Sequence, residues 1–110
     1  MKQIIYYTAL NGKCPFNEWF CSLDVKNQTQ ITKRINRLLD GHYGDYKKLK
    51  NSDLSELRFM TNKGYRIYFK ELDNILILFL AGGDKSNQKN SIKKAEQYYK
   101  EFNERLYANE

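Results

Sequence analysis

An unbroken run of apolar residues, Ile75 to Ala81, constrains the fold more than any other feature of the sequence. A short run without a polar residue is typical of a β-strand that is covered on both faces, because a strand with one solvated face alternates apolar and polar residues. The run is also the longest of its kind in the chain. It is far shorter than the roughly 18 residues that a membrane-spanning helix needs. The sequence therefore predicts a globular domain built around one central strand.

Two segments ahead of this run show a period of two. In Leu54–Met60 and in Tyr65–Lys70, polar and apolar side chains alternate. Such alternation is typical of a strand with one face on the core and the other on solvent. Turn residues stand between the two segments at Asn62-Lys63-Gly64, and before the apolar run at Asp73-Asn74. Short turns join antiparallel neighbours, so we expect a three-strand meander.

The remaining segments predict a further strand and three helices. Ile4–Tyr7 is β-branched and aromatic, as strands are. Pro15 suits the first turn of a helix, where its missing N–H costs nothing. Apolar residues recur at helical spacing over 16–23, 31–39 and 91 to about 106. The order of elements is therefore β-α-α-β-β-β-α.

This order predicts a small two-layer α+β domain with its helices on one face of the sheet. An N-terminal strand and a helical hairpin come first, then the antiparallel meander and a C-terminal helix. The chain has 110 residues, the length of one domain, so we expect residues 1–110 to form a single domain. The first residues do not resemble a signal peptide, and a cytoplasmic protein is the expectation.

The charge distribution points to an anionic partner. The formal net charge is +6. Most of it lies in one segment, from Lys26 to Lys50, which contains seven Lys and Arg residues and only two Asp residues. A concentration of this kind favours binding to nucleic acid, although a solvated helix face explains the helical part of the segment equally well.

The cysteine and histidine content excludes several kinds of site. Cys14, Cys21 and His42 are too few to supply the four ligands of a structural zinc ion. A single histidine also excludes a catalytic His/His pair within one chain. No phosphate-binding loop, dinucleotide fingerprint or nucleophile elbow is present. We expect neither a metal ion nor a cofactor.

The two alternating strands place four polar residues close together. Glu56 and Arg58 share the polar face of one strand, and Arg66 and Tyr68 share that of its neighbour. Two arginines there repel each other unless Glu56 or an anion lies between them. The face is either a solvated surface with one Arg–Glu pair or a clamp in which arginines bind phosphate oxygens.

Two further segments bring basic residues toward this face. Lys48 or Lys50 can join the clamp from the preceding loop. The run Gly82-Gly83-Asp84-Lys85-Ser86 follows the central strand. Its glycines allow close approach of the backbone, and Lys85 adds positive charge; ordinary turn chemistry explains the glycines as well.

Several motifs in order resemble a known family. Gly44-Asp45-Tyr46-Lys47-Lys48, Ser55-Glu56-Leu57-Arg58, Gly64-Tyr65-Arg66-Ile67-Tyr68-Phe69 and 82–86 are spaced as in the "addiction module killer protein" group of the RelE/ParE toxin superfamily, close to the HigB toxins. The segment from Gly12 to Trp19 is similar too. The resemblance covers roughly Ile4 to Phe102.

The resemblance implies the toxin of a type II toxin–antitoxin system. RelE and HigB members cut mRNA on the ribosome, and an adjacently encoded antitoxin, usually with a helix-turn-helix domain, neutralises them. The complex then binds operator DNA through the antitoxin. ParE relatives share the fold but inhibit DNA gyrase, which is the alternative function. A non-catalytic nucleic-acid-binding domain is a third interpretation.

The resemblance also implies roles for individual residues. Arg66 corresponds to the arginine at the scissile phosphate, Arg58 and Lys48 to basic strand and loop residues, and Lys85 to a second basic residue after the central strand. These cations stabilise the charge that develops when the RNA 2′-OH attacks phosphorus. No metal is needed for this reaction.

The same interpretation assigns the proton transfer and RNA contacts. Glu56, or a lysine among the arginines, removes the 2′ proton, and Tyr68 positions the nucleophile or stacks on a base. Tyr98 and Tyr99 are candidates for an aromatic residue near the C-terminal helix, or core residues. The residues expected to bind RNA are Lys47, Lys48, Lys50, Lys33, Arg34 and Arg37, of which those on the helix can equally face an antitoxin.

Overall fold

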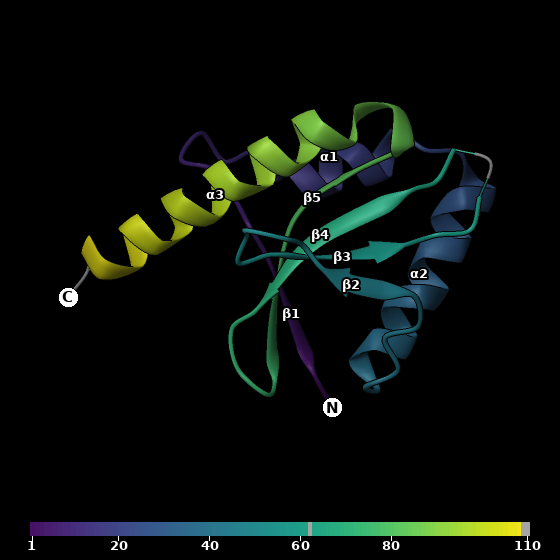
Figure 1. Ribbon diagram of the computed structural model, residues 1–110, viewed down its shortest axis with the longest axis horizontal. Helices are drawn as coiled ribbons and strands as arrows, with labels where there is room; N and C mark the ends of the chain where they lie inside the picture. Colours follow the sequence, from purple (N-terminus) through teal and green to yellow (C-terminus); the bar gives the residue numbers. More distant parts are fainter. Residues whose placement is uncertain (62, 109–110) are drawn as a thin grey trace.

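A computed structural model of the chain describes residues 1–61 and 63–108. The elements, in order, are β1 (Gln3–Tyr6), α1 (Pro15–Cys21), α2 (Val25–Leu39), β2 (Tyr46–Lys48), β3 (Ser55–Arg58), β4 (Arg66–Glu71), β5 (Leu76–Gly83), a 3-10 turn η1 (Lys85–Asn87) and α3 (Gln88–Ala108) (Figure 1). The expected α+β class is confirmed, and the expected elements occur in the expected order, with one additional strand, β2, between α2 and β3. Asn62, in the expected turn between β3 and β4, lies outside the described residues.

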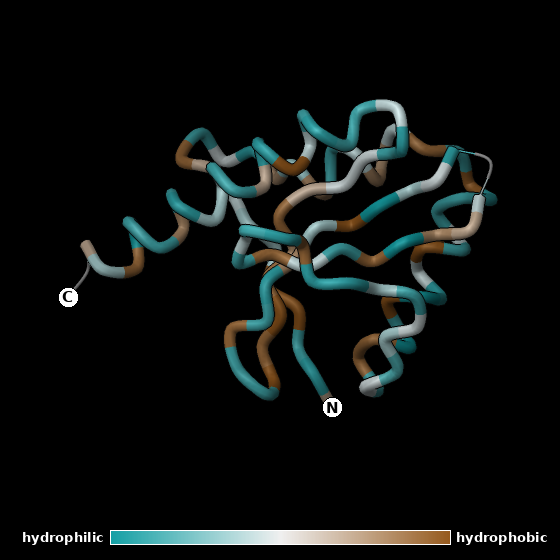
Figure 2. Tube along the Cα trace, viewed as in Figure 1, coloured by the Kyte–Doolittle hydropathy of each residue, from teal (hydrophilic) through white to brown (hydrophobic). Residues whose placement is uncertain are grey.

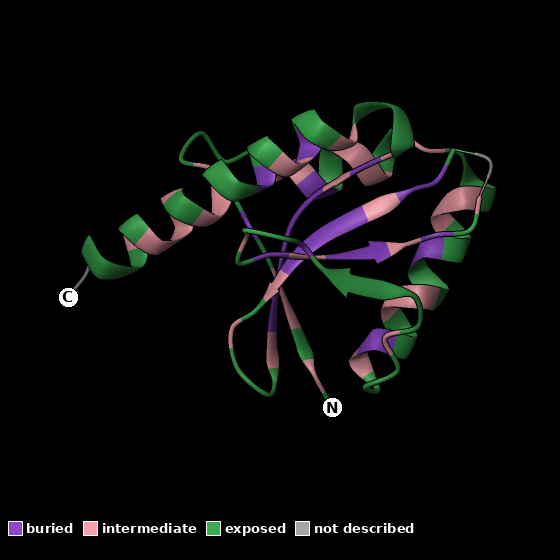
Figure 3. Cartoon of the chain, viewed as in Figure 1, coloured by how far each residue is buried: buried purple, intermediate pink, exposed green. Residues whose placement is uncertain are grey.

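All five strands form one mixed sheet in the order β1-β5-β4-β3-β2. The meander β3-β4-β5 is antiparallel, as its short turns predict, and β1 pairs in parallel with β5. The apolar run therefore does lie inside the sheet, between β1 and β4. Figure 3 shows the consequence: β3, β4 and β5 are largely buried, and β2 at the edge is exposed.

The two faces of the sheet carry different helices. Ile77 and Phe79 of β5 pack in one apolar cluster with residues of α1 and α2, whereas Leu78 and Leu80 pack in a second cluster with residues of α3. The sequence predicts helices on one face of the sheet, whereas the structure divides them between both faces. The reason is β5 itself, because a strand that is apolar on both sides needs cover on both sides.

Local sequence signals set the ends of the helices. Pro15 stands in the first turn of α1. The Asp24 carboxylate accepts a hydrogen bond of 2.9 Å from the backbone N–H of Asn27 and so caps α2. Gly41, at φ 90°, follows the end of α2. α3 is longer than the predicted 91–106 at both ends, and most of its residues are hydrophilic (Figure 2).

Contacts with Tyr7, the residue that follows β1, hold α3 against the sheet. The hydroxyl of Tyr7 donates a hydrogen bond to the Glu101 carboxylate. Its ring stacks on Tyr98 at a centroid distance of 5.0 Å, and the Arg105 guanidinium lies 5.2 Å from the centroid. The last turns of α3 extend beyond the sheet (Figure 1). None of the described helices has the length and apolar character needed to cross a membrane.

Candidate functional site

The strand register brings the predicted polar residues together on the sheet face that α3 partly covers. Arg58 of β3 is the direct neighbour of Arg66 of β4, and Arg66 is the neighbour of Gly83 of β5. Two residues along each strand, Glu56 is paired with Tyr68. Successive residues of a strand point to opposite faces, so these four side chains share one face. The predicted grouping is therefore present.

Arg58 has a carboxylate partner, but it is not Glu56. Its Nη2 lies 2.9 Å from Oδ1 of Asp45, and its Nε donates to the same oxygen at 3.3 Å. This is the one direct ion pair among residues 1–61 and 63–108. Both side chains are partly exposed, at 34% and 42%, so water weakens the pair. The alternative expectation for this face is a solvated ion pair between an arginine and Glu56. The structure has an ion pair between Arg58 and Asp45 instead.

Arg66 is the unpaired arginine of the site. Its side chain is half-buried, and its buried Nε has no hydrogen-bond partner in the described part of the chain. Its position opposite Gly83 leaves no side chain from β5 directly beside it. A half-buried guanidinium without a carboxylate partner among the described residues, next to a second arginine, is suited to a phosphate group, which accepts two parallel N–H bonds.

Glu56 is buried behind this pair of arginines. It is 1% exposed, and it accepts a hydrogen bond of 3.1 Å from Nε2 of Gln88 at the start of α3. An RNA 2′-OH therefore does not reach its carboxylate in this structure. Glu56 is therefore not positioned to take a proton from RNA directly, and it can act only through the residues that surround it.

Tyr68 is likewise buried. Its ring has no exposed surface, and its hydroxyl has no partner among the described residues. Burial, and next the charge of Glu56, raise the pKa of Tyr68 above its usual value. Stacking on an RNA base is therefore wrong for Tyr68, because stacking requires an open ring face.

The two glycines after β5 serve packing. A Cβ at Gly82 would lie 2.1 Å from the Trp19 ring, and one at Gly83 would lie 2.6 Å from Oγ of Ser91. The helices α1 and α3 thus approach the backbone from opposite sides. Lys85, which follows, is exposed.

The residues predicted to bind RNA behave differently from one another. The guanidinium of Arg34 donates to the backbone oxygens of Tyr43, Asp45 and Arg58 at 2.6 to 3.1 Å. Arg34 therefore holds the loop before β2 and is not available to RNA. The other predicted residues are exposed: Lys33, Arg37, Lys47, Lys48 and Lys50.

The register also separates the two lysines of β2. Lys47 is paired with Glu56 and therefore shares the face of the arginines, whereas Lys48 is paired with Ser55 on the other face. The expected clamp member Lys48 is thus replaced by Lys47. Tyr98 and Tyr99 are half-buried and pack against the apolar cluster beneath α3.

Asp45 and Gln88 belong to the site and were not predicted for it. Asp45 stands in the first motif of the resemblance, but its pairing with Arg58 depends on how Arg34 holds the loop. Gln88 reaches Glu56 across 32 positions of sequence. No spacing rule within a strand or helix indicates either contact.

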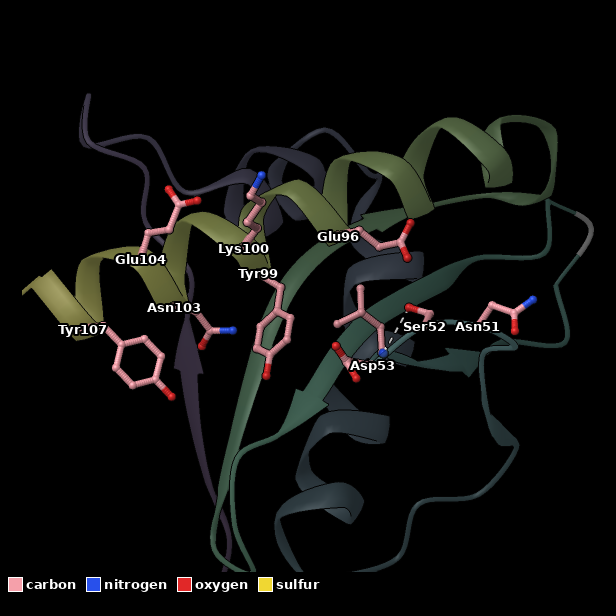
Figure 4. Close-up of a pocket in the computed structure, with 10 residues that line it drawn as sticks. Asn51, Ser52, Asp53, Glu96, Tyr99, Lys100, Asn103, Glu104 and Tyr107 are labelled. Atoms are coloured by element: carbon pink, nitrogen blue, oxygen red, sulfur yellow. Dashed lines mark hydrogen bonds between the residues drawn. The ribbon is translucent and has the colours of Figure 1, made fainter.

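A groove of about 630 Å³ lies between α3 and the loop before β3, and its lining contains neither Arg58 nor Arg66 (Figure 4). Its lining includes three carboxylates, those of Asp53, Glu96 and Glu104, and one ammonium group, that of Lys100. Figure 4 shows these side chains with Tyr99 and Tyr107 along the groove. A lining with excess negative charge disfavours a phosphate backbone, so the arginine face is the better candidate for nucleic acid.

Comparison with known proteins gives one informative relative. No protein-family model matches the chain. An uncharacterized protein of Haemophilus influenzae is 40% identical over 81 residues, which are 73% of this chain and 81% of that protein.

Proposed function

This chain belongs to the same family as the Haemophilus influenzae protein, and we propose that it is the toxin of a type II toxin–antitoxin system. In this proposal it is a metal-independent endoribonuclease of the RelE/HigB kind, acts on mRNA at the ribosome in the cytoplasm, and inhibits translation. One observation carries the proposal: Arg66 is half-buried, forms no ion pair among the described residues and stands directly beside Arg58, on a partly open sheet face of a chain with net charge +6.

The arginines supply the charge that the reaction needs. When the 2′-oxygen attacks the neighbouring phosphorus, the P–O5′ bond breaks, and a 2′,3′-cyclic phosphate and a 5′-OH end form. The phosphoryl oxygens gain negative charge on the way. Arg66 and Arg58 stabilise that charge, and each contact of this type lowers a barrier by about 2.7–4 kcal/mol when water is excluded. Lys85 adds a further positive charge at the end of β5.

The proton of the 2′-OH needs an exposed acceptor. Arginine does not serve, because its pKa exceeds about 12, and Glu56 is buried. Lys47 shares the arginine face and is exposed, so it is the lysine that this proposal places beside the 2′-OH. A site with so few groups for proton transfer is consistent with a nuclease that relies on the ribosome to align the mRNA.

The remaining partners follow from the same proposal. A cognate antitoxin, encoded adjacently and carrying a helix-turn-helix domain, neutralises the toxin. The pair binds operator DNA through the antitoxin.

Expression of the chain alone in a bacterial host tests the proposal. We expect growth to stop and new mRNA 5′ ends to appear within translated codons. Arg66→Ala should abolish both effects. Lys13→Ala, which removes an exposed lysine outside the site, should leave both unchanged, provided circular dichroism shows that each variant is folded.

Other results would point elsewhere. A DNA-damage response without mRNA breaks would replace the nuclease by the gyrase-inhibitor alternative. Absence of any growth defect would leave a non-catalytic binding domain. Full toxicity of Arg58→Ala, Arg66→Ala and Lys85→Ala would show that the site is elsewhere on the molecule.

A further inference from the structure

A small hollow of about 400 Å³ lies where β5 ends and η1 begins. It is lined by Lys63, Asp84, Lys85 and Ser86. Lys63 comes from the turn between β3 and β4, and the other three follow β5. Lys63 is not among the residues that the sequence predicts for the site.

The hollow carries net positive charge. Both lysines are exposed, and neither forms an ion pair within the described ranges. The carboxylate of Asp84 does not form an ion pair with either lysine. Its Oδ1 accepts hydrogen bonds from the backbone N–H of Ser86 at 2.9 Å and from the Ser86 hydroxyl. The hydrogen bond from that hydroxyl is the main reason that the pKa of Asp84 lies below its usual value, and the charge of Lys63 contributes least. Two ammonium groups over one hollow repel each other and are therefore stabilised by an anion.

Backbone contacts hold the two lysines in place. The N–H of Lys85 donates to the carbonyl oxygen of Lys63 at 3.1 Å. The stem of Lys85 lies against Gly64, where an added Cβ would come within 3.3 Å of the Lys85 Cβ. Gly64 also has φ 63°, a conformation that suits glycine. The β3–β4 turn and the end of β5 therefore position the hollow as one unit.

The hollow adjoins the arginine face. Gly83, the register partner of Arg66, precedes Lys85 by two positions on the same strand end. We propose that Lys63 and Lys85 form a second phosphate-binding subsite, which takes the phosphodiester next to the one at Arg66. This inference rests on the proposed function, because it assumes that Arg66 holds the scissile phosphate of a single-stranded RNA. Lys63 is then a substrate-binding residue, and RNA crosses from the sheet face to the hollow.

Binding of a 2′-O-methyl RNA hexanucleotide tests the subsite without cleavage, because the attacking hydroxyl is blocked. We would measure its affinity for the full chain over a series of KCl concentrations. Each phosphate contact on a single strand adds about 0.7 to the slope of log K against log salt. Lys63→Ala should reduce the magnitude of the slope by about 0.7 and weaken binding of every sequence alike. Arg66→Ala should reduce it similarly, and Lys13→Ala should not change it.

The outcomes separate the subsite from the proposed function. If Lys63→Ala leaves affinity and slope unchanged while Arg66→Ala lowers both, the subsite is wrong and the nuclease site stands. If Lys63→Ala lowers the slope and Arg66→Ala does not, RNA binds at the hollow but the proposed scissile position is wrong. If wild-type protein does not bind the hexanucleotide, or no variant alters binding, both ideas are overturned. A Lys63→Arg variant should retain the wild-type slope, since it keeps the charge.

Discussion

Glu56 is a charged residue in a place that does not favour charge. It is 1% exposed, its side chain accepts a hydrogen bond from the neutral amide of Gln88, and the nearby Tyr68 hydroxyl is unpartnered among the described residues. Removing a carboxylate from water costs free energy, which a hydrogen bond from a neutral amide offsets only in part. Natural proteins retain such arrangements chiefly where function needs them. We infer that the charge of Glu56 supports the arginines in front of it.

A substitution at Glu56 tests this inference at the residue scale. Glu56→Gln keeps the shape and an oxygen that accepts from Gln88, but it removes the charge. We expect the free energy of unfolding to stay the same or to rise by about 1–2 kcal/mol, while toxicity in the expression assay falls. Urea unfolding measures the first quantity and growth measures the second.

Gln88→Leu is the matched comparison, because it leaves the buried carboxylate without its hydrogen bond. It should lower the free energy of unfolding by about 1–3 kcal/mol. A loss of stability in Glu56→Gln as large as that in Gln88→Leu would contradict the inference, since the charge would then stabilise the fold.

At the scale of elements, α3 is attached to β1 by Tyr7. Its hydroxyl donates to Glu101, and its ring contacts Tyr98 and Arg105. Burial, and next the hydrogen bond to Glu101, raise the pKa of Tyr7 to about 12 from its usual 10.0. The folded protein thus keeps this proton at a pH where the unfolded chain loses it.

The sign of the pH dependence follows from linkage. Below pH 10 both states bind the proton, and the contribution to stability is fully present. As pH rises from 10 to about 12, the unfolded state releases the proton first, so stability falls. Tyr7→Phe should flatten this alkaline fall and, at neutral pH, lower the free energy of unfolding by about 1.5–3 kcal/mol. Urea unfolding at pH 7 and at pH 9 to 11 measures both, and an unchanged alkaline fall in Tyr7→Phe would assign it to other groups.

The elements show where the sequence was informative. The periods of two and of 3.6 predicted the meander, its polar face and the three helices, because each signal is local. β2 was expected to be a loop, since Tyr46–Lys48 is too short to show a period and is exposed on both faces. The contacts of Asp45 with Arg58 and of Gln88 with Glu56 join distant segments, and they depend on how Arg34 and the start of α3 are placed. Tertiary packing decides such contacts, so no local pattern predicts them.

At the scale of the whole molecule, the net charge of +6 is unevenly placed. The arginine face and the lysine hollow are positive, and the groove beside α3 has a negative lining. A general attraction to RNA would depend on total charge, whereas binding at a site depends on where the charge lies. Two substitutions that each change the net charge to +7 separate these cases.

Asp45→Asn removes the carboxylate that competes with phosphate for Arg58, and Glu104→Gln removes one from the groove. Both leave the fold nearly as stable as wild type, because an exposed ion pair contributes only about 0–1 kcal/mol. We expect Asp45→Asn to strengthen binding of the 2′-O-methyl hexanucleotide and Glu104→Gln to leave it almost unchanged. Equal gains in affinity from the two variants would mean that RNA responds to the overall field, and Arg58 would then have no special part in holding it.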